Sequence, residues 1–308
     1  MNQQLKSMKY YFSKLLLFGE YSVINGSRAL AAPLSKFKGY WKQAQSKEEA
    51  FAQQRNLPDF IEAMKVKKEL EGILNIDQLE EDIHKGMYFS SNIPSGYGVG
   101  SSGALCAAVY DKYALNPITL HQPERFSELK ETLANMEQFY HGSSSGTDPL
   151  ICYLDKTILI DSEKGIQTLS FPKEHVTEAG YQFFLLDTDI MRSTGPLVKI
   201  FLEKCEDIIY RDRLMSEYIP QVEEIIEAFL QRQMDNIFDN FHFISHYQFK
   251  YFQEMIPPDC VQAWLDGLGS NVFKIKLCGA GGGGFLLGVT KNPLETEKVL
   301  KAYRLIFL

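Results

Sequence analysis

Two short glycine-dense segments constrain the fold of this chain more than any other feature of the sequence. The first is Pro94–Gly103, and the second is Gly279–Gly284, which ends in four consecutive glycines. Each glycine in an ordered element costs roughly 0.5–1 kcal/mol relative to alanine. A run of four therefore predicts backbone that takes positive φ angles or approaches another group closely. We expect that group to be a ligand rather than the partner strand of a simple hairpin.

Around these segments, hydrophobic patterning predicts a mixture of strands and helices. Strands are predicted at 10–18, 87–91, 157–160, 181–186, 272–277 and 285–289, and helices at 102–113, 123–140 and 222–230. The segment 39–86, which is rich in Lys, Glu and Gln, predicts solvated helices and loops. Because strands and helices do not alternate regularly, their order favours an α+β fold over a doubly wound parallel sheet.

Length, net charge and cysteine spacing exclude several classes of protein for this chain. A chain of 308 residues predicts two domains, and we place them at residues 1–175 and 176–308. With 39 acidic and 32 basic residues, the net charge of −7 argues against a broad nucleic-acid-binding surface. The five cysteines are widely spaced without a C-x-x-C pair, which argues against a disulfide framework or a cysteine zinc site. The apolar run at 15–18 is cut short by Glu20, so neither a signal peptide nor a membrane span is predicted, and we expect a cytoplasmic protein.

The first glycine segment has the composition of an anion-binding loop. Gly98, Gly100 and Gly103 flank Ser101 and Ser102, and a helix is predicted to follow directly. Unpaired N–H groups at a helix start, beside a flexible loop, form a cradle for phosphates. The same residues fit a simple glycine turn with a serine N-cap, and on their own they leave both interpretations open. They also match G-x-G-x-x-G, but the surrounding pattern is not the βαβ unit that a dinucleotide site requires.

A second cluster combines acidic and small residues. Glu137 lies near the end of a predicted helix, and the loop after it leads through 142–147 to Asp148. Asp148 is placed to accept the proton of a substrate hydroxyl, and Glu137 to ligate Mg²⁺ on a phosphate. The alternative is that Asp148 caps a turn and Glu137 is a solvated helix residue.

Two features farther along the chain predict structure rather than chemistry. His242 and His246 have a spacing compatible with zinc, but their apolar neighbours favour packing histidines. The aromatic run at 238–252 is predicted to be core.

The three clusters, in this order, resemble the GHMP small-molecule kinases, which include galactokinase, homoserine kinase, mevalonate kinase and phosphomevalonate kinase. Residues 11–23 resemble the first motif of the family, Pro94–Ala104 its P-x-x-x-G-L-G-S-S-A phosphate loop, and Gly279–Gly284 its third motif. Within the family the resemblance is closest to mevalonate kinases, because 141–148 reads H-G-x-x-S-G-x-D and 187–194 resembles their D-T-x-x-x-x-S-T turn.

This resemblance implies a two-lobed fold, with an N-terminal ribosomal-S5-like lobe and a C-terminal ferredoxin-like α/β lobe. It implies an enzyme that uses ATP and Mg²⁺, with Asp148 as the base, Lys14 as the cation beside it, and Ser102 and Glu137 as magnesium ligands. It places ATP against Pro94, Gly96, Gly98, Val99, Gly100, Ser101 and Ser102. It places the acceptor against Glu20, Tyr21, Ser145, Gly146, Thr194, Gly281 and Gly282.

The sequence also departs from the mevalonate kinase pattern. Ser13 replaces the usual glycine before the lysine, and Tyr21 replaces the usual histidine, so that residues 19–23 look more like the first motif of a phosphomevalonate kinase. Gly103, which follows the two serines of the phosphate loop, also favours that enzyme. We expect phosphorylation of (R)-mevalonate to 5-phosphomevalonate, a step in isoprenoid precursor synthesis. The alternatives are a phosphomevalonate kinase, another GHMP sugar or alcohol kinase, a catalytically silent ligand sensor and a dinucleotide-dependent oxidoreductase. The expected partner is a small-molecule substrate, without nucleic acid or membrane, for a monomer or homodimer.

Overall fold

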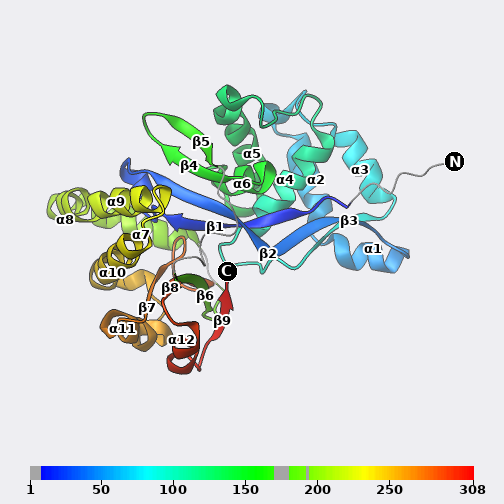
Figure 1. Ribbon diagram of the computed structural model, residues 1–308. Coiled ribbons are helices and arrows are strands. Elements are labelled where there is room, and N and C mark those ends of the chain that lie inside the picture. The colour runs from blue at the N-terminus through cyan, green and yellow to red at the C-terminus, as the bar shows by residue number, and fades with distance from the viewer. Residues whose placement is uncertain (1–7, 170–179, 192–193) are drawn as a thin grey trace. The chain divides into compact units, whose positions relative to one another are not determined.

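The chain forms two compact units, each assembled from separate stretches of sequence. The computed structural model describes residues 8–169, 180–191 and 194–308 (Figure 1). Unit 1 consists of the segment ending at Lys14, Pro33–Pro94 and Val99–Lys156, and unit 2 of Leu15–Ala32, Ser95–Gly98 and Thr157–Leu308. The division of the chain into domains at residues 1–175 and 176–308 stays a prediction. The main change of unit falls between Lys156 and Thr157, and residue 175 itself lies outside the described residues.

A five-stranded sheet contains residues of both units. Its strands are β1 (Tyr11–Phe18), β2 (Ala29–Gln43), β3 (Met87–Ser91), β4 (Thr157–Asp161) and β5 (Gly165–Leu169). The order is β1-β2-β4-β5, and β3 also pairs with β2. The length of β2 allows this branching, because its end at Gly39–Gln43 pairs with β3 in unit 1 and its start at Ala29–Ala31 pairs with β4 in unit 2.

Six helices accompany the sheet in unit 1. They are α1 (Lys47–Gln54), α2 (Leu57–Lys65), α3 (Ile76–His84), α4 (Ser101–Tyr113), α5 (Phe126–His141) and α6 (Thr147–Leu154). Helix α4 is the central one, because small and apolar residues on all its sides are buried, among them Ala104, Cys106, Ala107, Ala108 and Val109. Helices α2 and α3 are not simply solvated as predicted, since each buries one face through residues such as Phe60, Met64, Leu79 and Ile83.

Unit 2 is built on a second antiparallel sheet. Its strands are β6 (Gln182–Asp187), β7 (Phe273–Leu277), β8 (Phe285–Thr290) and β9 (Arg304–Phe307), in the order β7-β8-β6-β9. Helices occupy the two longer connections, with α12 (Pro293–Val299) between β8 and β9, so the chain order is that of a ferredoxin-like βαββαβ unit (Figure 1). This confirms the α+β class and the ferredoxin-like C-terminal lobe.

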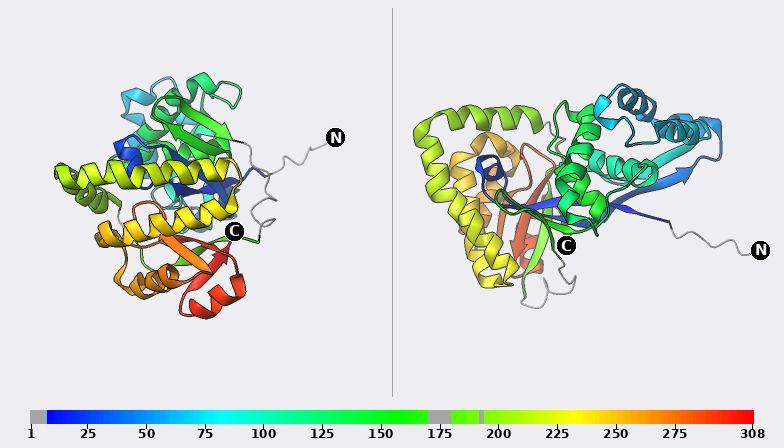
Figure 2. Two further views of the ribbon diagram at one scale, coloured as in Figure 1. Left: turned by 60° about the vertical axis from the view of Figure 1, so that its left-hand side comes forward. Right: turned by 90° about the horizontal axis from the view of Figure 1, so that it is seen from above.

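The connection from β6 to β7 holds five α-helices, among them the 18-residue α10, which is the longest in the described part of the chain. It contains α7 (Thr194–Glu206), α8 (Ile208–Arg213), α9 (Ile219–Leu230), α10 (Met234–Tyr251) and α11 (Val261–Gly269), and a π-helical turn at Leu214–Tyr218 leads into α9. Helices α9 and α10 lie side by side in both views of Figure 2. No helix in the described part of the chain is both long and apolar enough to cross a membrane.

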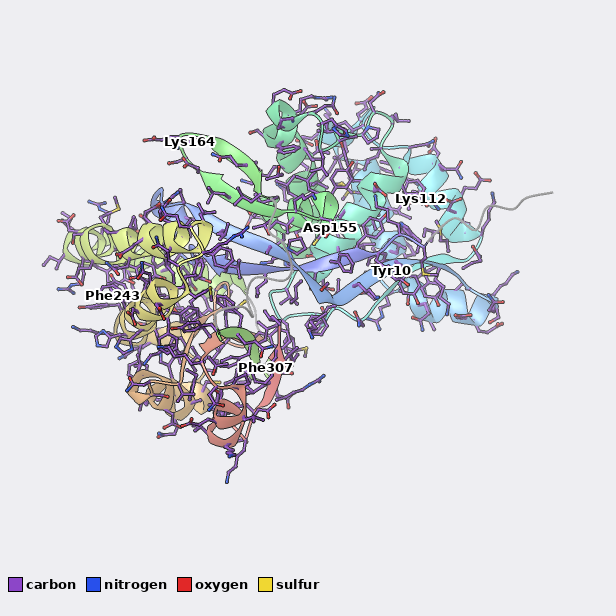
Figure 3. The ribbon with its side chains drawn as sticks, viewed as in Figure 1. Tyr10, Lys112, Asp155, Lys164, Phe243 and Phe307 are labelled. Atoms are coloured by element: carbon purple, nitrogen blue, oxygen red, sulfur yellow. The ribbon has the colours of Figure 1, made fainter. Side chains whose placement is uncertain are left out.

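The aromatic residues of α10 largely form the core that the sequence predicted. Phe238, Phe241 and Tyr247 are buried, whereas Phe243 is half-buried near the surface of the helix (Figure 3). His242 and His246 are exposed on the same helix, so the prediction that they pack in the interior was wrong. The reason is the period of the helix, which turns these two positions away from the stripe formed by Phe238, Phe241, Ile244 and Tyr247.

Candidate functional site

The first glycine segment leads directly into the start of α4. Gly96, Gly98 and Gly100 have φ angles of 77°, 69° and 80°, which only glycine adopts readily. Gly100 is the N-cap of α4, and no described side chain accepts a hydrogen bond at this cap. The first N–H groups of the helix and its positive dipole end are therefore available to an anion. Val99 is buried, and Ser101 and Ser102 are half-buried at the helix start.

Lys14 and Asp148 form an ion pair within unit 1. The Lys14 ammonium lies 2.9 Å from Asp148 Oδ1, and the exposed fractions of the two side chains are 8% and 34%. Lys14 extends from β1, where its backbone N–H donates to Val99 O at 2.9 Å. Asp148 lies in the first turn of α6 rather than in a loop as predicted, because the helix begins at Thr147 after Gly146 as N-cap. The pair therefore combines a buried cation with a carboxylate that stays accessible to solvent.

Glu137 is buried at the centre of a hydrogen-bond network beside this pair. Ser102 Oγ donates to Glu137 Oε1 at 2.8 Å, and Ser144 Oγ donates to Glu137 Oε2 at 2.5 Å. Ser102 Oγ also lies 2.9 Å from His141 Nε2. A hydroxyl has one hydrogen, so while Glu137 is ionised and accepts it, His141 Nε2 carries its own proton and donates to Ser102 Oγ.

The network has donor groups of the kind that Mg²⁺ prefers. Mg²⁺ is a hard cation, usually held by one or two carboxylates together with waters and substrate phosphates. Glu137 and Ser102 supply a carboxylate and a hydroxyl within hydrogen-bond distance of each other, next to an anion-binding helix start. Among the described residues there is no cluster of three or more His, Cys, Asp or Glu side chains that would hold a metal ion without such a substrate. Glu137 and Ser102 have the chemistry of the one or two protein ligands that Mg²⁺ usually takes.

Burial raises the pKa of Glu137 to about 7. The nearby Asp148 carboxylate adds to this rise, and the hydrogen bonds from Ser144 and Ser102 and the charge of Lys14 oppose it. Burial therefore favours the protonated form of this carboxyl, and a bound cation would favour the ionised form.

This shift in the Glu137 pKa predicts a pH-dependent stability. The unfolded chain ionises Glu137 in water near pH 4.5, but the folded protein ionises it only near pH 7, so stability falls as the pH rises between these values. The difference corresponds to about 3 kcal/mol above pH 7, at about 1.4 kcal/mol per pKa unit. We expect Glu137→Gln to raise the free energy of unfolding by up to that amount at pH 8, and to change it little at pH 4.5.

Urea unfolding of the ligand-free protein at several pH values measures this effect. Glu131→Gln is the matched control, since Glu131 is an exposed glutamate of the same helix. A Glu137→Gln profile parallel to that of the wild type would mean that Glu137 does not have a raised pKa.

The second glycine segment is packed against other parts of unit 2. A Cβ at Gly281 would lie 2.4 Å from Met255 O, and one at Gly283 would lie 2.5 Å from Ile190 O. A Cβ at Gly284 would meet Tyr97 O at 2.5 Å, and one at Gly282 would meet Leu197 Cδ1 at 2.5 Å. The close approach expected of a ligand is thus made by the chain itself, which explains why this segment requires glycine.

Other residues predicted to contact the acceptor also have contacts within unit 2. Glu20 is buried and forms an ion pair with Lys276. Tyr21 has φ 63° and is the centre of a tight turn in which Ser22 N donates to Glu20 O. The Tyr21 hydroxyl donates to Ala280 O at 2.6 Å. The side chain of Thr194 lies outside the described residues. An acceptor role for these positions stays a prediction.

Ser145 and Gly146 lie in unit 1, between α5 and α6. Ser145 is exposed, and its hydroxyl accepts from Thr147 N at 3.3 Å. Gly146 is buried, and a Cβ there would lie 2.0 Å from Lys130 O of α5. Gly146 therefore sets the start of α6, and with it the position of Asp148.

Sequence reasoning did not assign a role to Ser144 or His141, although both contact the candidate metal ligands. Ser144 also accepts from Gly146 N at 2.9 Å, so it links Glu137 to the loop before Asp148. The signal available was the run of three serines between two glycines, which is more hydroxyl-rich than a turn requires.

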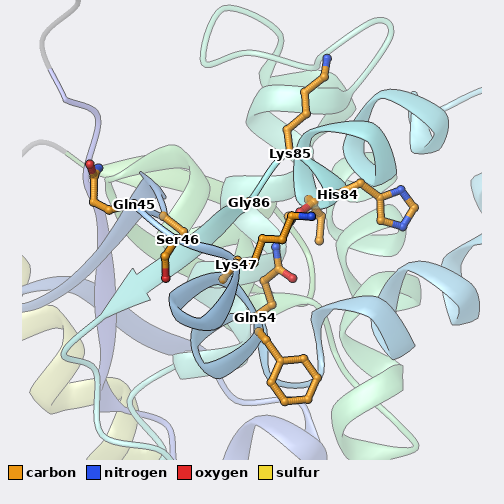
Figure 4. Close-up of a pocket in the computed structure, with 11 residues that line it drawn as sticks. Gln45, Ser46, Lys47, Gln54, His84, Lys85 and Gly86 are labelled. Atoms are coloured by element: carbon orange, nitrogen blue, oxygen red, sulfur yellow. The ribbon is translucent and has the colours of Figure 1, made fainter.

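A groove of about 470 Å³ lies elsewhere in unit 1, lined by residues of α1, by the end of α3 and by the segments beside them. Figure 4 shows its labelled residues, among them Gln45, Lys47 and His84. None of the lining residues belongs to the predicted site, so this groove has no part in the chemistry described above.

Comparisons with known proteins give matches to a family model and to solved structures. Residues 61–156 match the family model for the GHMP kinases N terminal domain. A mevalonate kinase of L. major in complex with R-mevalonate is similar over 98% of this chain and 93% of its own, at 19% identity and a TM-score of 0.64. A Streptococcus pneumoniae phosphomevalonate kinase with phosphomevalonate and AMPPNP is similar over 98% and 99%, at 14% identity and a TM-score of 0.63. A Lactococcus lactis galactokinase complexed with galactose covers 98% and 93%, at 16% identity and a TM-score of 0.61.

A search of curated proteins gives no match to the sequence. The matched segment 61–156 contains Ser102, Glu137 and Asp148, which lie together in unit 1 with Lys14. Residues 61–156 therefore resemble the N-terminal domain of the GHMP kinases, as the sequence motifs predicted, and the chain as a whole has the fold of the mevalonate, phosphomevalonate and galactose kinases.

Proposed function

We propose that this protein transfers the γ-phosphoryl group of ATP to the hydroxyl of a small molecule, and that the acceptor is (R)-mevalonate. The observation that carries the proposal is the Lys14–Asp148 pair beside the Ser102–Glu137 pair at the start of α4. It brings together a base, a cation, a pair of candidate metal ligands and an anion-binding helix terminus. These are the elements that phosphoryl transfer requires, since it depends mainly on positioning and electrostatic stabilisation.

In this mechanism Asp148 accepts the proton of the acceptor hydroxyl as the oxygen attacks phosphorus. The partly exposed carboxylate suits this role, because the acceptor must reach it from solvent. The ammonium of Lys14 keeps Asp148 in its ionised form and stabilises negative charge on the transferring phosphoryl group. The backbone N–H groups of Ser101 and Ser102 hold phosphate oxygens at the helix start.

Ser102 and Glu137 would hold Mg²⁺, which neutralises phosphate charge when bound. His141 and Ser144 orient these two ligands, because each donates to one of them. The proposed site therefore needs few reactive side chains, and most of its residues bind or position.

Phosphomevalonate is the second candidate acceptor. Tyr21 occupies the position where mevalonate kinases usually carry a histidine, and its hydroxyl is already hydrogen-bonded to Ala280 O. This position therefore departs from the mevalonate kinase pattern in both residue type and available hydrogen-bonding groups. The similarity to the Streptococcus pneumoniae phosphomevalonate kinase supports this acceptor to a comparable degree.

A coupled assay of ADP release tests the proposal. The protein is incubated with ATP, Mg²⁺ and one of four acceptors: mevalonate, 5-phosphomevalonate, galactose or homoserine. We expect turnover on mevalonate and, on the other three, a kcat/KM lower by at least about 100-fold, which is about 2.7 kcal/mol of discrimination. Turnover on phosphomevalonate alone would show that the acceptor is phosphomevalonate and not mevalonate, and the proposed phosphoryl transfer would still hold. Nucleotide binding without turnover on any acceptor would contradict the proposed activity.

A further inference from the structure

Helix α4 packs closely against the backbone of Asp148 at Gly103. A Cβ at Gly103 would lie 2.9 Å from Pro149 N, 3.0 Å from Asp148 C and 3.2 Å from Asp148 Cβ. Two of these are backbone atoms, which no rotamer change can move. A side chain at this position therefore requires α4 or the first turn of α6 to shift.

Helix α5 also holds the first turn of α6. The start of α6 packs against α5 at Gly146, where an added Cβ would lie 2.0 Å from Lys130 O. The turn that carries Asp148 is thus in contact with both α4 and α5, and a glycine lies at each of these contacts. A shift of this turn away from Gly103 must therefore also change its packing on α5.

The start of α4 also contacts Lys14. Gly100, the N-cap of the helix, lies three residues before Gly103. A Cβ at Gly100 would lie 2.9 Å from Lys14 Cγ. Both members of the ion pair therefore rest against bare backbone at the start of one helix.

We propose that Gly103 is a positioning residue for the proposed base: its missing side chain sets how closely Asp148 approaches α4, and so sets the 2.9 Å separation of Lys14 Nζ from Asp148 Oδ1. This inference rests on the proposed function. Gly103 contacts the backbone of Asp148 and acts only through it. Phosphoryl transfer responds steeply to such a change, since misplacement of a reacting group by about 1 Å costs about 100-fold in rate.

Gly103→Ala is the direct test. We expect kcat to fall about 10- to 100-fold, with the KM for ATP changed by less than about threefold. Alanine is a better helix former than glycine, which offsets the crowding, so the variant should fold with a cooperative unfolding transition. Gly269→Ala is the matched control, because Gly269 ends helix α11 and an added Cβ there meets nothing within 4 Å. It should leave kcat unchanged.

A double-mutant cycle separates positioning from a general structural effect. If Gly103 acts through Asp148, then Gly103→Ala in the Asp148→Asn background should reduce the remaining rate by less than about threefold. Loss of the same factor in both backgrounds would overturn the inference, as would a kcat of Gly103→Ala within threefold of the wild type. A variant that does not fold would also count against a role confined to Asp148.

Failure of the proposed function has a different signature. It would appear as a wild-type protein that turns over none of the acceptors. A crystal structure of Gly103→Ala then decides the inference by itself. An ion pair lengthened beyond hydrogen-bond distance supports it, and an unchanged 2.9 Å separation overturns it.

Discussion

Replacing Asp148 by asparagine is expected to lower kcat by about 100- to 10,000-fold, the usual contribution of a positioned general base. Asparagine keeps the shape of the side chain and its place in the first turn of α6, but it cannot accept the hydroxyl proton. The Lys14 ammonium would also lose its carboxylate partner, which lies at 2.9 Å in the wild type. Binding of nucleotide depends on the start of α4 and should change little.

The measurement is steady-state kinetics with the best acceptor, together with nucleotide affinity by calorimetry. Asp111→Asn is the matched control, because Asp111 also pairs with a lysine, Lys9 at 2.6 Å. It lies near the opposite end of α4, ten residues and therefore about 15 Å from Ser101. A kcat of Asp148→Asn within threefold of the wild type would remove Asp148 from the role of base.

Local sequence patterns were sufficient to predict most elements around this site. Continuous apolar runs predicted the strands that became β3 and β8, and the stripe of Val222, Ile225, Ile226 and Phe229 predicted α9. The candidate site residues were predicted from the order of the sequence motifs. Each motif lies on one helix or turn, so its residues can be recognised from local sequence. Lys14, Ser102, Glu137 and Asp148 indeed lie together in unit 1.

What the sequence did not reveal depends on contacts between distant segments. The glycines at 281–284 looked like a ligand loop, but their neighbours are Met255, Leu197, Ile190 and Tyr97, which no local pattern identifies. Similarly, the family resemblance assigned Glu20 to the acceptor. Its partner is Lys276, which is 256 positions away in the sequence. Pairings of this kind follow from the fold and not from spacing.

The buried pair of Lys276 and Glu20 carries the second large prediction. Both side chains are almost fully buried, at 0% and 1% exposure, and Lys276 Nζ also donates to Leu277 O at 2.9 Å. Lys276→Met would keep the apolar stem but leave the Glu20 carboxylate buried beside an uncharged group. Removing one partner of a buried ion pair typically costs about 3–5 kcal/mol. We expect the free energy of unfolding to fall by that amount.

Urea unfolding at pH 7 measures the loss, with Lys85→Met as control. Lys85 pairs with Glu81 on the surface, where both side chains are more than half exposed at 63% and 56%, so this change should cost less than about 1 kcal/mol. The double variant Glu20→Leu with Lys276→Met should recover most of the stability, because apolar replacements of a buried pair are often neutral.

The same set of variants also decides what Glu20 does. If the pair is structural, Glu20→Gln lowers stability and leaves the KM for the acceptor unchanged. If Glu20 instead contacts the acceptor, the KM rises, and Lys276→Met unfolds like the wild type. The second result would restore the role expected from the first motif, and would mean that Glu20 exchanges Lys276 for the substrate when the acceptor binds.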